Sequence, residues 1–364
     1  PPSRSTTTIP HVNIGWIHPF LEILDEVGVD VEAILKRAHL PTLSIDNGSV
    51  LVPTGKIYKF VTLAAQSANL DDLGFKAGQR VNIEALLPTA ERTWTRSGAF
   101  RSVKSFIDVA LDSSSNVDMW IESRDDPRPI TEFFYLGTFG PSHPAFSTVE
   151  QFMMALMVRW VRYGAGSSWN PDRINIRATS VPEAAVRELV GEASVRCRQP
   201  QTSIEFPSQQ FLGPIWEVPR RGSALWQRHQ RRLVDPRRAP DLAGSLRVVL
   251  PAYLPDGSPD IQKAATLAGT SVRTLQRRLS EQGVTYSELL EGLRHDLAIY
   301  LLRRSNQSAS AISRELGYRD PAIFTRAFRR WTGQTPSQYR AAAGAGAGGL
   351  KVWGDWRGGV EVGD

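Results

Sequence analysis

Apolar residues recur at helical spacing in two segments of the last third of the chain. One segment runs from Pro321 to Thr332 and the other from Ser271 to Gln282, and each places its apolar residues on one side and polar residues on the other. Both patterns predict amphipathic helices. The predicted inward positions are Ile323, Phe324, Ala327, Phe328 and Trp331 in the later segment, and Val272, Leu275 and Leu279 in the earlier one.

Helix-capping residues divide the later segment into two helices and a turn. Ser308 is placed to cap a helix that runs to Leu316, and Gly317 then ends it. Asp320 is placed to cap the next helix, with Pro321 at its first position, where the missing N–H costs nothing. Two helices joined by a short turn, the second apolar inside and basic outside, predict a helix-turn-helix.

The earlier segment repeats this order of caps, glycines and apolar positions. Aligning Ser271 with Asp320 places Leu275 on Phe324. Further pairs coincide, the last two after one inserted residue: Arg277 with Arg326, Leu279 with Phe328, Gly283 with Gly333, and Thr285 with Thr335. The agreement indicates a duplicated helix-turn-helix unit.

The stretch from Thr285 to Ser305 predicts one long helix between the two units. About 19 helical residues span roughly 28 Å, and successive major-groove faces of DNA lie about 34 Å apart. One chain is therefore expected to reach two half-sites about one helical turn apart. The predicted buried stripe of this helix is Leu289, Leu290, Leu293, Leu297, Tyr300 and Leu301.

The first two-thirds of the chain mix predicted strands and helices. The segments 117–123 and 130–136 alternate like adjacent strands joined by a turn, and 174–177 and 202–206 predict two more. A long helix is predicted over 149–163. This part is therefore expected to be an α+β domain.

Six aromatic residues of this α+β part are candidates to line an apolar pocket for a small molecule. Ordinary core packing is the alternative role for each of them. The six are Trp94, Trp120, Phe133, Tyr135, Phe152 and Trp160.

Positive charge is concentrated in the C-terminal third. From Arg220 to Arg340 there are 21 Lys and Arg against 10 Asp and Glu, a net charge of +11, whereas the whole chain carries +6. A basic segment beside a slightly acidic remainder predicts a polyanionic partner. A solvated basic face is the alternative, and the duplicated helix-turn-helix favours DNA over it.

Other chemistry is sparse. Cys197 is the only cysteine, which excludes an internal disulfide and a Cys-rich zinc site and fits a reducing cytoplasm. No run of about 18 apolar residues predicts a membrane span. Phosphate loops, nucleophile elbows, dinucleotide fingerprints and metal-ligand histidine spacings are all missing. We therefore expect no catalytic residue, metal or cofactor.

Three motifs of the second unit occur in the order of a known family: GYRD (Gly317–Asp320), FTRAFR (Phe324–Arg329) and GQTPSQYR (Gly333–Arg340). With SVRTLQRRL (Ser271–Leu279) in the first unit, they resemble the AraC/XylS family of bacterial transcriptional regulators, over about Leu242–Arg340. The front resembles, less specifically, the effector-binding region of a non-cupin subgroup of this family. Segments that carry this second likeness include 27–41 and 73–81, the latter as a glycine-marked helix end.

The resemblance implies which residues meet DNA. Base-edge contacts would fall to Arg273, Gln276, Arg277, Ala322, Thr325 and Arg326, and phosphate contacts to Thr274, Arg278 and Arg329. The implied partners are double-stranded DNA, RNA polymerase and a small-molecule effector, with a homodimer as a further expectation.

These interpretations divide the chain into four segments. They are an effector-binding domain (1–218), an Arg/Pro-rich linker with one helix at 223–234 (219–240), the double helix-turn-helix domain (241–340), and a low-complexity tail expected to be disordered (341–364).

The main functional hypothesis is a cytoplasmic, sequence-specific transcriptional activator controlled by a small molecule. One alternative is an effector-independent regulator whose front domain only dimerises. Another is a DNA-repair-type enzyme with this DNA-binding module, whose chemistry would require an activated Cys197.

Overall fold

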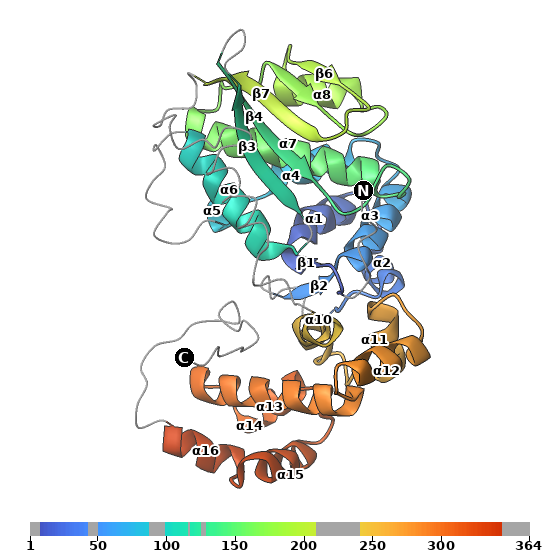
Figure 1. The fold of residues 1–364 in the computed structure, drawn as a ribbon, viewed down its shortest axis with the longest axis vertical. Helices are drawn as coiled ribbons and strands as arrows, with labels where there is room; N and C mark the ends of the chain where they lie inside the picture. Colours follow the sequence, from blue (N-terminus) through green and yellow to red (C-terminus); the bar gives the residue numbers. More distant parts are fainter. Residues whose placement is uncertain are drawn as a thin grey trace. The chain divides into compact units, whose positions relative to one another are not determined.

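The computed structural model describes residues 8–42, 50–86, 99–115, 117–124, 129–208 and 241–343. The chain folds into two compact units, which are described separately (Figure 1). The sheet unit comprises Trp16–Ala38 and Ile57–Arg237. The helical unit comprises Pro1–Gly15, His39–Lys56 and Arg238–Asp364.

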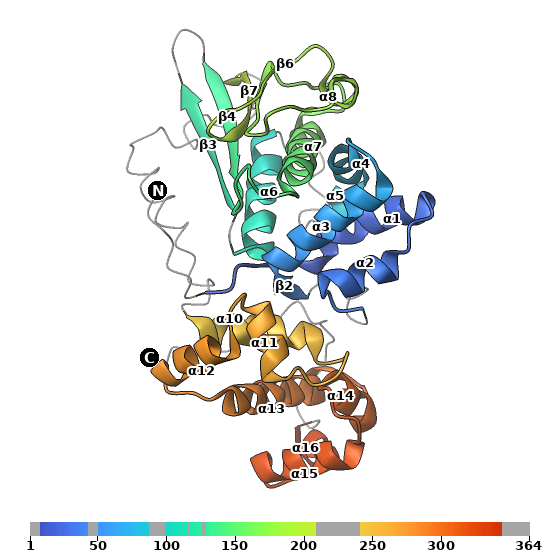
Figure 2. The same cartoon turned by 90° about the vertical axis from the view of Figure 1, so that its right-hand side faces the viewer.

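The sheet unit is built on a five-stranded sheet of order β3-β4-β7-β5-β6, antiparallel except between β5 and β6. Its strands are β3 (Asp118–Arg124), β4 (Ile130–Leu136), β5 (Arg173–Asn175), β6 (Ser194–Arg196) and β7 (Thr202–Pro207). Its helices are α1 (His18–Glu26), α2 (Val31–Ala38), α3 (Thr54–Ala68, which begins in the other unit), α4 (Leu73–Arg80), α5 (Ile83–Leu86), α6 (Ala99–Ser113), α7 (Phe146–Ala165) and α8 (Glu183–Val190). Figure 2 shows α6 and α7 along one face of the sheet.

The sequence pattern located four strands and one long helix of this unit. The four predicted strands form β3, β4, β5 and β7, and the predicted helix over 149–163 forms the larger part of α7. The α+β class is confirmed. The sequence pattern did not predict the bounds of β6, which is only three residues long, or those of α1, α3, α5, α6 and α8.

Two glycines set the distance between α4 and α7. A Cβ atom on Gly74 would lie 2.1 Å from the carbonyl oxygen of Thr148, and one on Gly78 would lie 2.6 Å from Cβ of Ala155. The resemblance of the 73–81 segment led us to expect glycines that mark a helix end. The two glycines do not have this role. They lie inside α4, where only a missing side chain allows this close approach.

Polar side chains of α7 reinforce this packing. Arg159 donates hydrogen bonds of 2.9 and 2.8 Å from Nη1 to the carbonyl oxygens of Gly78 and Val81. Carbonyls in the last turn of a helix have no partner within the helix, so Arg159 satisfies groups that burial would otherwise leave unpaired. Gln151 does the same for the Asp71 carbonyl, at 2.8 Å.

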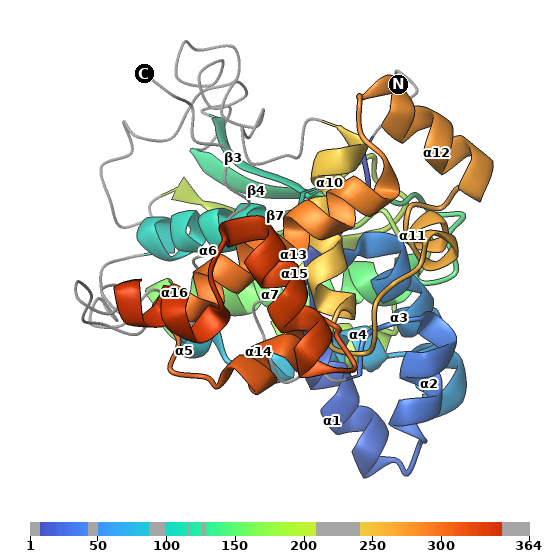
Figure 3. The same cartoon turned by 90° about the horizontal axis from the view of Figure 1, so that it is seen from below.

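The helical unit contains α10 (Leu242–Val249), the 3-10 helix η5 (Leu250–Tyr253), α11 (Ile261–Leu267), α12 (Val272–Glu281), α13 (Tyr286–Arg304), α14 (Ala309–Glu315), α15 (Pro321–Thr332) and α16 (Pro336–Ala343). The helix pairs α11–α12 and α14–α15 are the two predicted helix-turn-helix units. They lie apart in the three views, with α13 between them (Figures 1 and 3).

Two short strands from the start of the chain also belong to the helical unit. β1 (His11–Asn13) pairs antiparallel with β2 (Leu51–Pro53), and a 3-10 helix, η1 (Ile14–Ile17), follows β1. β2 contacts α10 and η5, and the backbone N–H of Thr42 donates to Asp256 at 3.3 Å. The sequence pattern did not predict this association, because each strand is only three residues long.

The predicted caps are present. The side chains of Ser271, Ser308 and Asp320 each accept a backbone N–H in the first turn of their helices, and Thr285 forms a capping box with Glu288. Gly333 ends α15 in the left-handed conformation at φ 75°. The predicted linker helix at 223–234 and the tail from 344 onward lie outside the described residues.

We predict that Gly74→Ala destabilises the sheet unit, because the added Cβ would overlap the backbone of α7 and force the two helices apart. Overpacking of this kind costs about 1–3 kcal/mol. Urea unfolding measures the change. Gly140→Ala is the control in the same unit, because a Cβ atom there meets nothing within 4 Å. Equal losses in both variants would contradict the close-approach explanation.

Candidate functional site

α15 is fixed to the helical unit by its apolar side. Phe324 and Phe328 are fully buried and Ala327 is nearly so. The ring of Phe328 packs edge-on against Tyr339 of α16 at 5.5 Å, and Phe324 lies 5.7 Å from Tyr318 in the preceding turn. These contacts leave the opposite side of α15 facing solvent.

Trp331 lies at the edge of this apolar side and ties α15 to α13. It is half-buried, and its indole Nε1 donates to Glu291 of α13 at 2.6 Å. Arg330 binds the same carboxylate. The two donors lower the pKa of Glu291, the Trp331 bond being the larger cause.

The solvent-facing side of α15 carries the residues expected to meet DNA. Ala322, Arg326 and Arg329 are exposed, and Thr325 is half-buried with its hydroxyl donating to the Pro321 carbonyl at 2.9 Å. Neither Arg326 nor Arg329 forms an ion pair with a residue that the structure describes. Both guanidinium groups are therefore available to an external anion.

α12 has the same organisation. Leu275 and Leu279 are buried, whereas Arg273, Gln276 and Arg277 are exposed. Thr274 and Arg278, the expected phosphate contacts, are half-buried. Arg277 pairs with Glu281 one turn along the helix, and both side chains are more than half exposed. Exposed pairs of this kind are weak, so a nucleic-acid group can replace the carboxylate.

The prediction that Ile323 faces inward is wrong. Its side chain is 46% exposed, and Val27 is the other large apolar residue that is strongly exposed among the described residues. Successive residues are separated by about 100° around a helix, so the buried arc centred on Phe324, Ala327 and Phe328 is too narrow to include it. Val272 of α12 is half-buried for the same reason.

The second helix-turn-helix unit is held by contacts with α13 and with the segment between η5 and α11. Arg294 of α13 donates to the carbonyl of Leu316 at 3.0 Å, and its guanidinium lies 4.6 Å from the ring centroid of Tyr318. Gly317, at φ 76°, lies so close to the end of η5 that a Cβ would be 2.7 Å from the carbonyl oxygen of Leu254. These contacts hold the turn that precedes α15 against α13 and η5.

The candidate pocket aromatics of the sheet unit are not gathered around one cavity. Trp94 lies outside the described residues, and the other five are buried. Trp160 stacks on Phe106, which in turn contacts Phe133. Phe152 packs instead against Phe20.

The remaining two aromatics have different neighbours again. Trp120 stacks on Phe134 at 4.9 Å, on the sheet face opposite Phe133, because neighbouring residues of a strand point to opposite faces. Tyr135 lies against Tyr58 of α3, and the two hydroxyl groups are hydrogen-bonded. These five residues therefore form part of the core at several places.

A buried polar cluster in the sheet unit had no signal in the sequence. Glu150 of α7 is 1% exposed; it accepts the hydroxyl of Thr202 and lies 3.5 Å from Nη1 of Arg177. The hydroxyl pair of Tyr58 and Tyr135 lies nearby. Burial raises the pKa of Glu150 to about 7, although Thr202 and Arg177 act to lower it. The four partners come from distant parts of the chain, so no local pattern could have identified them.

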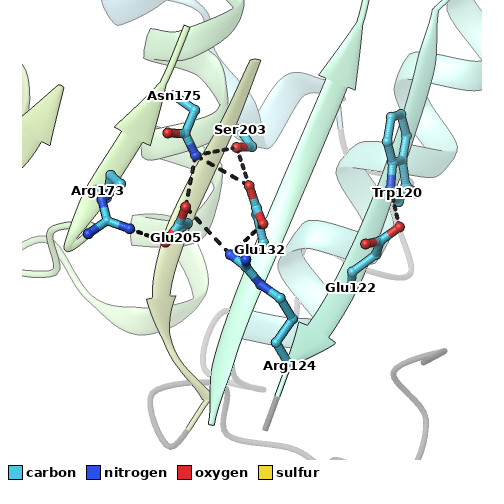
Figure 4. A network of polar contacts seen from close by, with 8 residues as sticks. All are labelled: Trp120, Glu122, Arg124, Glu132, Arg173, Asn175, Ser203 and Glu205. Atoms are coloured by element: carbon cyan, nitrogen blue, oxygen red, sulfur yellow. Dashed lines mark hydrogen bonds and ion pairs between the residues drawn. The ribbon is translucent and has the colours of Figure 1, made fainter. Parts of the chain in front are cut away.

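A second polar network lies on the other face of the sheet (Figure 4). Glu132 and Glu205 are direct cross-strand neighbours, which would repel each other if unpaired. Arg124 contacts both carboxylates, at 2.8 and 3.5 Å, and Arg173 contacts Glu205 at 3.0 Å. Asn175 adds further donors, so the network joins four strands.

Metal-binding and membrane-spanning features are missing from the described residues. These residues contain no group of three or more His, Cys, Asp or Glu side chains placed to hold a metal ion. No helix among them is both long and apolar enough to cross a membrane.

Models of known protein families match both parts of the chain. Residues 28–214 match the model described as the arabinose-binding domain of AraC transcription regulator, N-term, and residues 264–342 match a helix-turn-helix domain. The first match covers more than half of the chain. The chain belongs to the AraC family of transcription regulators.

Relatives agree with this assignment. The HTH-type transcriptional regulator VirS of Mycobacterium tuberculosis is 24% identical over 328 residues, which cover 89% of this chain and 95% of VirS. The ornithine utilization regulator of Pseudomonas aeruginosa is 42% identical over 88 residues, 24% of this chain and only 26% of that regulator. The crystal structure of CdpR from Pseudomonas aeruginosa aligns over 90% of this chain and 98% of that chain, at 18% identity and a TM-score of 0.38. The family models and these relatives are those of DNA-binding transcriptional regulators.

We predict that the stability of the sheet unit falls between about pH 4.5 and pH 7 because of Glu150. Its pKa is raised from 4.5 to about 7 in the folded state, so the unfolded chain releases this proton first as the pH rises. A rise of this size corresponds to about 3 kcal/mol.

Urea unfolding at pH 5 and pH 7.5 measures this effect, and Glu150→Gln is expected to reduce the difference between the two conditions. Glu188→Gln, on an exposed position of α8, should keep the wild-type difference. An unchanged difference in Glu150→Gln would show that this carboxyl is not the group responsible.

Proposed function

We propose that this regulator is a transcriptional activator that reads two DNA half-sites with α12 and α15 and responds to a small molecule bound in the sheet unit. The observation that carries the DNA part is the duplication itself. Two capped helices, each anchored by buried apolar residues, present exposed basic side chains on either side of one rigid helix.

The resemblance to the AraC/XylS family supplies the proposed residue roles. Arginine can donate two hydrogen bonds to guanine in the major groove, and glutamine can donate one to adenine N7 and accept one from adenine N6. Contacts to phosphates position the protein on the duplex without reading its sequence. The proposed base contacts are Arg273, Gln276, Arg277, Ala322, Thr325 and Arg326, and the proposed phosphate contacts are Thr274, Arg278 and Arg329.

The length of α13 supports two adjacent grooves on one side of the duplex. Its 19 residues give a rod of roughly 28 Å, comparable with the helical repeat of about 34 Å. The contacts of Arg294 and Gly317 hold the second helix-turn-helix unit against α13 and the end of η5, which limits how far α15 can turn. One chain can therefore occupy both half-sites without a second copy.

Selection of bound sites from random DNA by the full-length protein, at two salt concentrations, tests this proposal. Two short conserved blocks about 10 bp apart are expected. The proposal would be contradicted if no sequence were enriched and binding disappeared as the salt concentration rose. That result would indicate a basic surface with no sequence preference.

Effector control is proposed on the family match of residues 28–214 and on the buried polar cluster around Glu150. Polar groups enclosed by aromatic rings can orient a small molecule. RNA polymerase contact and dimerisation are further proposals from the family. A thermal-shift screen of small metabolites tests the effector. If no compound shifts the unfolding temperature but the protein is a constitutive dimer, the effector-independent alternative is favoured.

We predict that Arg277→Ala and Arg326→Ala each weaken binding to the selected site by about 1–3 kcal/mol. Each removes a guanidinium able to form paired hydrogen bonds with a guanine. Fluorescence anisotropy with labelled DNA measures the change at one fixed salt concentration. Arg187→Ala, at an exposed position of α8, makes the same charge change on the other unit and should bind like wild type. Wild-type affinity in both recognition-helix variants would refute the assigned register.

A further inference from the structure

The N-terminal turns of the two recognition helices differ in polarity. In the alignment of Ser271 with Asp320, Arg273 corresponds to Ala322 and Thr274 corresponds to Ile323. Pro321, Ala322 and Ile323 are all exposed, so α15 begins with an apolar surface of three residues. The corresponding turn of α12 presents an arginine and a hydroxyl group.

This apolar surface has no structural explanation within the helical unit. The core side of α15 is complete without Ile323, since Phe324, Ala327 and Phe328 fill it. A β-branched residue at an exposed helical position also has lower helix propensity than alanine or leucine. A strongly exposed isoleucine at this position therefore points to a contact with another molecule.

The position of Ile323 identifies that molecule as the DNA itself. N-terminal residues of a recognition helix are the ones that reach base edges in the major groove. Ile323 is one turn from Arg326, roughly 60° around the axis, and Arg326 is an exposed cation without an ion pair among the described residues. Ala322 beside it is small enough to allow the helix to approach closely.

The major groove offers one apolar group, the C5-methyl group of thymine. The first turn of α15 has few free side-chain donors, because Pro321, Ala322 and Ile323 carry none and the Thr325 hydroxyl is already bonded to the Pro321 carbonyl. We infer that Ile323 contacts the methyl group of a thymine. This apolar contact would add to the hydrogen bonds proposed for Arg326 in the half-site read by α15, whereas the first turn of α12 would read its half-site through polar side chains. The inference rests on the proposed reading of DNA by α15.

Replacing thymine by deoxyuridine tests this contact, because it removes the methyl group and leaves all hydrogen-bonding groups in place. Each thymine of the selected site is replaced in turn, and the Kd is measured by fluorescence anisotropy for wild type and for Ile323→Ala. One position in the α15 half-site should weaken wild-type binding by about fourfold, which corresponds to ~0.8 kcal/mol for one buried methyl-sized group. In Ile323→Ala the same replacement should change Kd by less than about 1.5-fold.

Two controls separate this contact from general effects. Val27→Ala, which removes the other strongly exposed large apolar side chain, should keep the wild-type deoxyuridine effect. Ile323→Thr keeps the branched shape and guards against a change in folding; it should bind the deoxyuridine site and the thymine site more equally than wild type does.

Three outcomes would overturn the inference while leaving the proposed function intact. The first is a specific site with no thymine in the α15 half-site, and the second is a deoxyuridine effect that persists unchanged in Ile323→Ala. The third is that Ile323→Ala binds DNA like wild type but no longer activates the promoter, which would assign Ile323 to a protein contact. Failure of the proposed function is a different result, namely that wild type selects no specific site.

Discussion

The arrangement of the DNA-binding surface depends on the burial of α13 among the helices around it. Leu289, Leu293, Leu297 and Leu301 are almost completely buried, and α13 contacts α10, α14, α15 and α16. A helix enclosed on several sides cannot shift without opening a cavity, which is costly in a close-packed core. α15 contacts α13 directly, and α12 contacts α10, which in turn contacts α13. Arg294, Glu291 and Gly317 add contacts that hold the second helix-turn-helix unit in place. The distance between the two reading surfaces is therefore a property of the core.

The sheet unit is organised around α7 in a comparable way. Gly74 and Gly78 let α4 approach α7 closely, and Arg159 satisfies the carbonyls at the end of α4. The same helix carries Glu150 into the core, where its charge is countered by Arg177 and Thr202. A buried ion pair adds little stability compared with apolar residues of the same shape, because desolvation offsets the attraction. Because enclosed polar groups can orient a small molecule, this cluster is the place where we propose effector chemistry.

The two recognition helices share a frame and differ in what they present. Caps, inward residues and Arg277 or Arg326 coincide in the alignment, whereas the first exposed turn is polar in α12 and apolar in α15. Packing requirements keep the buried positions of a duplicated unit alike, and the exposed positions are free to differ. The inward orientation predicted for Ile323 was wrong for this reason. A hydrophobic pattern cannot distinguish an apolar residue that faces the core from one that faces a partner.

Local signals in the sequence determined the helix-turn-helix part from α12 onward, but not α10, η5 or α11. Caps at Ser271, Thr285, Ser308 and Asp320 act within one helical turn, and apolar spacing identifies the buried side, so α12 to α16 could be predicted with their ends. The candidate DNA-facing residues could be named for the same reason. Only the tertiary structure decided the rest: the association of β1 and β2 with α10, the close contact at Gly74, the separation of the pocket aromatics, and the cluster around Glu150. Each of these joins residues far apart in the chain, and a contact between distant segments is set by how whole elements pack, which no local pattern contains.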